Sequence, residues 1–410
     1  MNTYYFLIFI FALLFTALSI KRLDFALAFI LFALPSYLLR FKVFFIPFTL
    51  LELMIIILFL VWFLKRIFSG EKVYLGKFRY LIFLWLAVAS LAVIVSPNKI
   101  SALGIWKAYF LEPVLFFFVF INEIKDKKDL ELVLTALGAG ALIVSLIAFY
   151  QKFTGWLVPY QYWFKGEGRR VTGVFPYPNA LALYLGPIIG LLLGRIFKGG
   201  WEKKKFFYLI VSFFSFLAIV FARSEGAIAA LVLSLFVFGL SFKKYRLKTI
   251  LIILILIILF TTIPLFREYL INKFNGQDWS VKVRLTLWQE SWQMLKDNWL
   301  FGAGLAGYQK KIVPYHQAKY IEIFLYPHNI FLNFWSELGL FGLLTFLLLL
   351  LKSFKEVKKK LIVKNNFFAL SCLLALLIII FHGLVDVPYF KNDLSLLFWL
   401  IIGLINLRNF

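Results

Sequence analysis

The chain has 410 residues, of which 63% are hydrophobic, 20% aromatic and only 16% charged. A soluble chain of this length has too little interior to bury so much apolar surface, so the composition excludes an ordinary globular protein and indicates a membrane protein. The formal net charge of +24 at pH 7 would suit a nucleic-acid-binding protein, but the positions of the basic residues explain it differently.

Stretches of about sixteen or more residues with almost no charge recur along the chain, as in transmembrane helices. We expect an all-α polytopic fold, one integral membrane domain over residues 1–410, with twelve or thirteen crossings. Within the first forty residues, the two short spans are alternatively a re-entrant segment or one broken helix. The candidate spans are 3–20, 24–39, 44–64, 80–96, 103–122, 130–150, 177–194, 206–222, 226–242, 249–264, 329–351, 367–384 and 393–408.

Positive charge is concentrated in short segments between these spans. Two candidate spans separate each basic segment from the next, so all of them lie on one side, which the positive-inside rule makes cytoplasmic. The net charge therefore reflects topology, and we expect no nucleic-acid partner. The basic segments are 65–79, 123–132, 195–205, 243–248 and 352–364, and the outward connections are 97–102, 151–176, 222–226, 265–328 and 385–392.

The outward loop 151–176 ends in paired arginines, Arg169 and Arg170, followed by Gly and Pro residues at a helix entrance. Guanidinium groups bind phosphate through parallel hydrogen bonds, and a helix N-terminus adds partial positive charge, so this is a candidate anion site. The alternative is that both arginines extend to the membrane interface without a substrate role.

The longest departure from the apolar pattern is 265–328, which we expect to be a long outward loop containing short helices. Its residues Leu287, Trp288, Ser291 and Trp292 have the spacing of an amphipathic helix that lies along the membrane surface. Arg284 opens this stretch and either binds a substrate anion or faces solvent and lipid headgroups.

His328 stands where the chain re-enters the membrane, between Pro327 and Asn329. A histidine titrates near neutrality and is suited to take a proton from a hydroxyl group. Asn329 and Glu337 follow on the same helix and direct polar groups toward its mouth. The alternative is an interfacial histidine bonded to the backbone. His316 has no comparable setting and is expected to be an ordinary loop residue.

His382 and Asp386 lie one helical turn apart at the end of the penultimate span. They are a candidate acid–base pair, although such a pair also stabilises helix ends. Cys372 lies mid-span and is expected to serve packing. The sequence contains no H-E-x-x-H motif, no paired aspartates and no P-loop, so we expect no metal and no cofactor.

Together these residues give the chain a resemblance to the O-antigen ligase and polymerase superfamily of bacterial membrane glycosyltransferases, and most to the O-antigen ligases. The resemblance covers essentially the whole chain in the expected order. The stretches that carry it are 170–179 (RVTGVFPYPN), 284–304 with its turn DNWLFGAG, 328–339 (HNIFLNFWSELG) and 382–386 (HGLVD) followed by Asn392 and Asp393.

The resemblance implies a multi-pass protein of the bacterial inner (cytoplasmic) membrane with its active site facing the periplasm. It implies metal-independent, inverting transfer of a glycan from undecaprenyl pyrophosphate to lipid A-core or another glycan acceptor, with membrane lipid as a further partner. Matching motifs place the pyrophosphate contacts on Arg170 and Arg284 and the catalytic base on His328. The candidates for a supporting role are Arg169, Asn329, Glu337, His382 and Asp386.

Two alternatives stay open from the sequence. An O-antigen polymerase joins lipid-linked repeat units and uses a second lipid-linked glycan as acceptor. A polysaccharide transporter performs no chemistry, but transporters tend to show inverted repeats and polar sites at mid-membrane, and the polar residues here gather at one face. The chain departs from the family at Arg223-Ser224-Glu225-Gly226, where members often have Ser-Arg-Gly, so the resemblance implies no role for Arg223.

Overall fold

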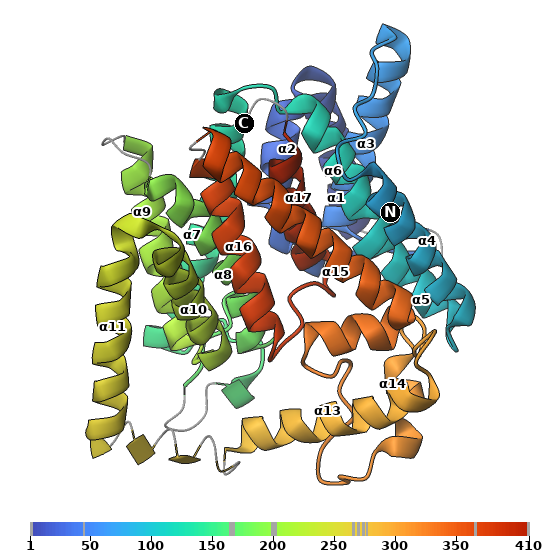
Figure 1. Ribbon diagram of the computed structural model, residues 1–410. Coiled ribbons are helices and arrows are strands. Elements are labelled where there is room, and N and C mark those ends of the chain that lie inside the picture. The colour runs from blue at the N-terminus through green and yellow to red at the C-terminus, as the bar shows by residue number, and fades with distance from the viewer. Residues whose placement is uncertain are drawn as a thin grey trace.

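The computed structural model describes residues 3–43, 46–163, 169–197, 203–264, 267–268, 271–272, 275, 278–364 and 367–407. Within them the fold is almost entirely helical (Figure 1). The elements of the N-terminal part are the α-helices α1 (Thr3–Lys21), α2 (Leu23–Phe32), α3 (Leu50–Ser69), α4 (Arg79–Val95), α5 (Lys99–Ile105), α6 (Glu112–Glu123) and α7 (Lys127–Thr154), the 3₁₀ turn η1 (Leu34–Leu38), the π-helical segment η2 (Trp106–Leu111) and the strands β1 (Arg40–Val43) and β2 (Ile46–Thr49).

The C-terminal part contains longer helices and most of the outward loop. Its elements are α8 (Pro178–Ile196), α9 (Lys203–Phe221), α10 (Glu225–Ser241), α11 (Lys243–Thr262), α13 (Trp279–Asp297), α14 (Tyr308–Lys311), α15 (Ile330–Lys364), α16 (Phe367–Gly383) and α17 (Asn392–Asn406), with the 3₁₀ turns η3 (Gln161–Trp163) and η4 (Val313–Tyr315). Parts of the two expected outward loops, 164–168, 265–266, 269–270, 273–274 and 276–277, lie outside the described residues.

Each expected span overlaps a helix, but the helices differ in length. By length and composition alone, six helices among the described residues are able to cross a membrane, and the count of twelve or thirteen crossings stays a prediction. These six are Thr3–Lys21, Lys99–Glu123, Lys127–Thr154, Pro178–Ile196, Lys203–Phe221 and Ile330–Ile362; the shorter apolar helices are Leu23–Phe32, Arg79–Val95, Glu225–Ser241, Phe368–Gly383 and Asn392–Asn406.

The expected span 24–39 is not one continuous helix. Helix α2 ends at Phe32, and Pro35 lies in the 3₁₀ turn that follows, because proline fits the start of such a turn but removes a backbone donor from a helix interior. An antiparallel hairpin then pairs β1 with β2, with Arg40 opposite Thr49. The all-α expectation therefore holds apart from this hairpin.

The expected span 44–64 likewise begins later, since α3 starts at Leu50. The side chain of Thr49 accepts a hydrogen bond from the N–H of Glu52, and the Glu52 carboxylate accepts one from the N–H of Thr49. This reciprocal capping box fixes the start of α3 directly after the hairpin.

Helix α8 is the central element of the C-terminal half and is buried along nearly its whole length between α9 and α16. Gly194 makes this close packing possible, because a Cβ atom there would lie 2.3 Å from the backbone nitrogen of Ser371 on α16. Since α8 begins at the same end of the molecule at which α16 finishes, this packing brings the residues around Pro178 beside those that follow Gly383.

Helix α15 is broken at Gly339, whose φ is 72°, a backbone conformation that glycine adopts with little strain. A Cβ atom at this position would lie 2.2 Å from the carbonyl oxygen of Leu300 in the outward loop. The N–H of Leu340 donates to that same oxygen at 3.0 Å. The break in α15 is therefore the place where the turn after α13 docks.

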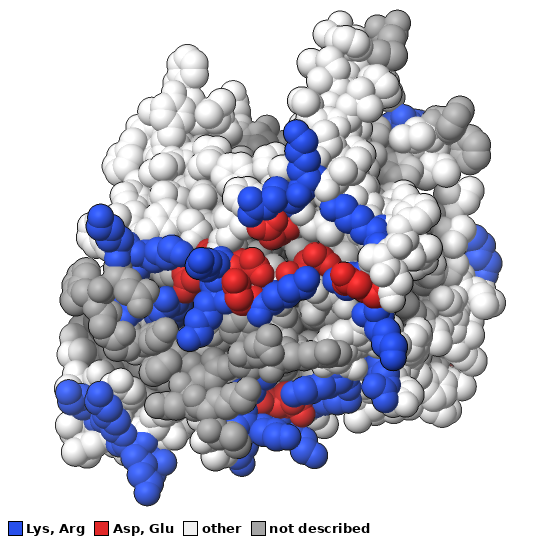
Figure 2. Space-filling view, turned by 90° about the horizontal axis from the view of Figure 1, so that it is seen from above, with Lys and Arg blue, Asp and Glu red and all other residues white. Residues whose placement is uncertain are grey.

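The two ends of the molecule differ in character. In Figure 1, α13 runs across the lower end of the molecule with α14 beside it, as expected for a helix along a membrane surface. The upper end, seen from above in Figure 2, carries many Lys and Arg side chains with several acidic ones among them.

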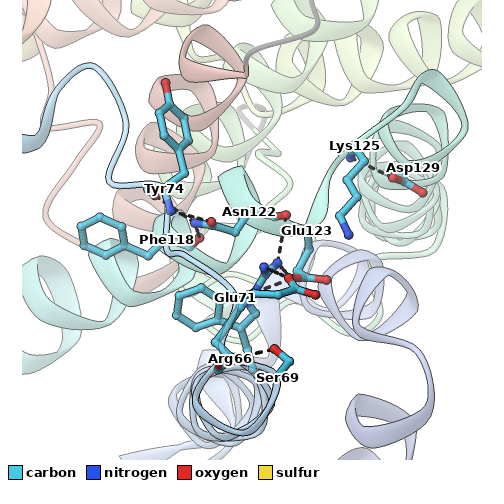
Figure 3. Close-up of polar contacts among 10 residues, drawn as sticks. Arg66, Ser69, Glu71, Tyr74, Phe118, Asn122, Glu123, Lys125 and Asp129 are labelled. Carbon is cyan, nitrogen blue, oxygen red and sulfur yellow. Dashed lines mark hydrogen bonds and ion pairs between the residues drawn. The ribbon is translucent and has the colours of Figure 1, made fainter.

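Ion pairs secure this basic end. Arg66 at the end of α3 pairs with Glu71 and, at 2.6 Å, with Glu123 at the end of α6 (Figure 3). Asn122 accepts a hydrogen bond from the N–H of Tyr74 at 2.9 Å and donates one to its carbonyl at 3.0 Å. The segment between α3 and α4 is thereby fixed against α6.

Candidate active site

His328 and Asp386 form the centre of the site. Nδ1 of His328 lies 3.4 Å from Oδ1 of Asp386, an ion-pair distance rather than a well-formed hydrogen bond, and 29% of the histidine side chain is exposed. The backbone of His328 has a φ of 49°, which is uncommon for a residue with a Cβ atom. Such strained conformations are often found at functional sites.

The carboxylate of Asp386 is buried and firmly held. Oδ2 accepts a hydrogen bond from Nδ2 of Asn179 at 3.1 Å, and Oδ1 accepts one from the N–H of Val387 at 2.9 Å. Burial alone raises the pKa of a carboxyl, but His328, His382 and the Val387 N–H outweigh it, so the pKa of Asp386 lies below its usual range. Asp386 is therefore a fixed negative charge beside His328.

Arg170 is joined to this centre by Asn179. Nη2 of Arg170 donates to Oδ1 of Asn179 at 3.1 Å, and its Nε donates to the carbonyl of Ala222 at 2.8 Å. The guanidinium also lies 5.4 Å from the ring centroid of Trp163. Asn179 thus uses both ends of its amide to connect an arginine with the buried carboxylate.

Arg284, on α13, approaches the same segment from the outward loop. Its Nε donates to the carbonyl of Val385 at 2.8 Å, and its Nη1 donates to Oγ of Ser280 at 2.7 Å. Among the described residues, none accepts a hydrogen bond from its Nη2. Of the two arginines predicted to bind pyrophosphate, Arg170 is therefore bonded to the amide that holds Asp386, and Arg284 to the residue before Asp386.

The arginines act on one another electrostatically. Burial lowers the pKa of Arg170, and the charges of Arg223 and Arg284 lower it further, while Glu225 opposes them. Like charges held this close favour the binding of an anion between them. Arg223 has a φ of 50° at the turn between α9 and α10. No role for Arg223 was expected from the sequence, yet its charge reaches Arg170.

The polar residues after His328 organise the backbone. Oδ1 of Asn329 accepts hydrogen bonds from the N–H groups of Phe331 and Leu332, which caps α15, and its Nδ2 donates to the carbonyl of Leu384. Asn329 thereby holds the start of α15 against the end of α16 and fixes the approach of His328 to Asp386.

Glu337 lies further along α15 and is buried. Its Oε2 accepts a hydrogen bond from the N–H of Ala306 at 2.6 Å, and Ala306 has a φ of 57°. The contact that the structure describes for Glu337 therefore fastens the turn after α13, close to the break at Gly339.

The remaining candidates lie around this centre. His382 is 2% exposed, and no hydrogen bond joins it to Asp386 within the described part of the chain. Arg169 is exposed, and its carbonyl accepts from Nζ of Lys152 at 3.5 Å. His316 is buried against Glu290, with Nδ1 and Oε2 3.0 Å apart, and so it anchors the loop. Cys372 is buried, as expected.

The sequence reasoning missed Asn179 as a site residue, although it ends the stretch 170–179 that carried the resemblance. Its position directly after Pro178, at the first turn of α8, was the available signal, since polar side chains there point at the space before the helix. The described residues bring no group of three or more His, Cys, Asp or Glu side chains together as a metal site would require.

The fold and the site together define a class of protein: a multi-pass membrane protein in which a histidine, a carboxylate and two arginines lie together at one end. Residues 210–347 match a family model described as O-Antigen ligase, a range that includes Arg284 and His328 and excludes Arg170 and Asp386. Over this range, about a third of the chain, the protein is similar to the O-antigen ligase family, and this similarity indicates a glycosyltransferase type of activity in O-antigen processing. No curated protein matches the chain significantly.

Proposed function

We propose that the protein transfers a glycan from undecaprenyl pyrophosphate to a hydroxyl group of an acceptor, lipid A-core, at the outer face of the inner membrane. The observation that carries the proposal is the meeting of Arg170 and Arg284 with the His328–Asp386 pair at Asn179 and Val385. A base and a polycationic anion site are the two parts that this reaction needs.

His328 would act as the general base. Asp386 faces Nδ1, so the proton on that nitrogen is directed toward the carboxylate and Nε2 is left to take the proton of the acceptor hydroxyl. A fixed carboxylate also stabilises the imidazolium that forms. This division of roles follows from which ring nitrogen Asp386 approaches.

The arginines would stabilise the leaving group. As the acceptor oxygen bonds to the anomeric carbon, the bond from that carbon to the pyrophosphate breaks, and undecaprenyl pyrophosphate departs with the bonding electrons. Its charge needs hydrogen-bond donors more than a proton, which the guanidinium groups of Arg170 and Arg284 supply without a metal. Attack opposite the leaving group inverts the configuration at the sugar carbon.

The distribution of basic residues supports a site at the periplasmic face. The basic segments place the opposite end in the cytoplasm under the positive-inside rule, and α13, α14 and His328 then face the periplasm. A lipid-linked donor and a lipid-anchored acceptor can both reach a site at the membrane surface, which supports a reaction between two lipid-borne glycans.

Purified full-length protein given the lipid-linked glycan, with and without lipid A-core, tests the proposal by the masses of the products. Transfer that requires lipid A-core supports a ligase. Lengthened lipid-linked chains without core would instead make the protein an O-antigen polymerase. If neither product forms and the protein instead carries glycan across the membrane of proteoliposomes, the enzymatic function is contradicted.

A further inference from the structure

Three tyrosines from separate segments gather beside the His328–Asp386 pair. Tyr109 lies in the π-helical segment η2, Tyr177 directly precedes α8, and Tyr326 lies two residues before His328. π-Helical segments are rare and frequently occur at functional sites. We call Tyr109, Tyr177 and Tyr326 the tyrosine patch.

The three side chains are close to one another and to the site. Burial raises the pKa of Tyr326, and the charges of Tyr109 and Tyr177 raise it further. Burial and then the charge of Asp386 raise the pKa of Tyr177. Each tyrosine is therefore within electrostatic range of another, and Tyr177 is within range of the carboxylate that faces His328.

The tyrosine patch remains accessible despite these surroundings. Tyr177 keeps 38% of its surface exposed, and Tyr109 and Tyr326 are half-buried. Their hydroxyl groups form no hydrogen bond with any described residue, whereas the fully buried Tyr308 and Tyr389 bond to Ser291 and to the carbonyl of Tyr109. Polar groups in such a setting are available to a ligand.

The segment from Val385 to Phe390 shows on which side of His328 the patch lies. At its start the carbonyl of Val385 accepts from Arg284, and the next residue, Asp386, faces His328. At its end the ring of Phe390 lies 5.6 Å from Tyr326 and 6.4 Å from Tyr109, centroid to centroid. The order along this segment is therefore Arg284, the catalytic pair, and then Tyr326 and Tyr109.

The charge around the patch favours a neutral ligand. The nearby Lys391 lies with its Nζ 3.4 Å from both carboxylate oxygens of Asp393 and 4.6 Å from the centre of the Phe175 ring. Because Asp393 neutralises this ammonium, Lys391 does not attract a phosphate there. The charge of Arg40 also reaches Tyr109, but the charges of Asp393, Glu52 and Glu337 oppose it. An apolar polyprenyl chain fits poorly too, since it would cover the tyrosine hydroxyls without bonding to them.

From this arrangement we propose that the tyrosine patch binds a sugar ring of the acceptor. A pyranose ring presents C–H groups to aromatic faces and hydroxyls to phenolic oxygens, which matches the patch. The inference rests on the proposed function: in an inverting displacement the acceptor oxygen approaches opposite the leaving pyrophosphate. With Arg284 on one side of His328, the acceptor belongs on the other.

Tyrosine-to-phenylalanine variants test the proposal because they remove one hydroxyl and keep the ring. Full-length Tyr109→Phe, Tyr177→Phe and Tyr326→Phe would be assayed in nanodiscs with undecaprenyl-pyrophosphate-linked glycan as donor and lipid A-core as varied acceptor. If the wild type uses a second lipid-linked glycan instead, that molecule takes the place of lipid A-core. The control is Tyr320→Phe, a tyrosine of the same outward loop that is 59% exposed.

We expect KM for the acceptor to rise about threefold to tenfold in each variant, the scale of one lost hydrogen bond. KM for the donor and kcat at saturating acceptor should stay within about twofold of wild type, and Tyr320→Phe should match wild type. An unchanged acceptor KM in all three variants would overturn the subsite while leaving the glycosyltransferase function intact. A rise in KM for the donor instead would contradict acceptor binding and assign the tyrosine patch to the donor.

A second measurement does not depend on turnover. Lipid A-core alone should slow oxidation of Tyr177 and Tyr326 by hydroxyl radicals, read by mass spectrometry, while oxidation of Tyr320 continues. Equal oxidation with and without lipid A-core would contradict the subsite. If the wild type transfers glycan to neither acceptor, the proposed function fails and the subsite fails with it.

Discussion

Nδ1 of His328 lies 3.4 Å from Oδ1 of Asp386, although the two residues come from different ends of different helices. The capping of α15 by Asn329, whose Nδ2 donates to the Leu384 carbonyl, and the packing of α8 on α16 create this contact. The same carboxylate is bound by Asn179, which also holds Arg170. One buried charge therefore organises both the base and the anion site.

Replacement of Asp386 by Asn tests the orienting role of this charge. The amide keeps the shape but removes the partner that holds Nδ1–H and stabilises the imidazolium. We expect kcat to fall about a hundredfold or more while the protein still inserts and folds. The control is Asp297→Asn, which changes an exposed carboxylate bonded to Tyr315; equal activity of the two variants would contradict the role.

The lowered pKa of Asp386 predicts how its contribution to stability depends on pH. A carboxyl whose pKa is lower in the folded than in the unfolded state stabilises the fold above its unfolded pKa, about 4, and loses this contribution as the pH falls further. The difference in unfolding temperature between wild type and Asp386→Asn should be constant from about pH 5 to 7 and shrink below about pH 4. A difference that grows on acidification would be inconsistent with an ionised Asp386.

Arg284→Lys tests whether the planar guanidinium matters. A lysine keeps the charge but cannot donate to Val385 from one nitrogen while presenting another to pyrophosphate. We expect kcat/KM for the lipid-linked donor to fall about tenfold to a hundredfold. Lys282→Arg, an exposed change on the same helix, should match wild type. Full activity of Arg284→Lys would reduce the role of Arg284 to simple charge attraction.

Asn179→Ala separates the two halves of the site. Without the amide, Arg170 loses one acceptor, and the Asp386 carboxylate loses one donor. Hydrogen bonds to charged groups contribute about 1.5–3 kcal/mol, so we expect kcat/KM to fall about tenfold to a hundredfold. Asn98→Ala removes the side-chain cap of α5 and controls for lost stability, since it should lower the unfolding temperature without lowering kcat. Normal turnover of Asn179→Ala would show that the bridge is dispensable.

The sequence predicted the helices well, because apolar length and charge placement depend on the membrane rather than on neighbouring residues. It did not predict the hairpin before Leu50, since a short apolar strand and the start of a span share the same composition. The break at Gly339 was also missed; it depends on the approach of Leu300, a contact between distant residues.

In the candidate site, too, the sequence predicted some features and missed those that depend on contacts between distant residues. Arg170, Arg284 and His328 were identifiable by residue type and position, and the structure brings them to one centre. His382 was the expected neighbour of Asp386 by helical spacing, but α16 ends at Gly383, so the carboxylate turns toward His328 and Asn179 instead. Local spacing predicts a pair only while the helix continues.

Single-turnover transfer by His328→Ala, measured alongside donor binding, tests the central claim most directly. The protein should insert, fold and bind the lipid-linked donor like wild type, because the arginines are untouched. The rate of transfer to the acceptor should fall at least about a hundredfold, the scale of a lost general base. Transfer at a near-normal rate in this variant would contradict the assignment of His328 as the base.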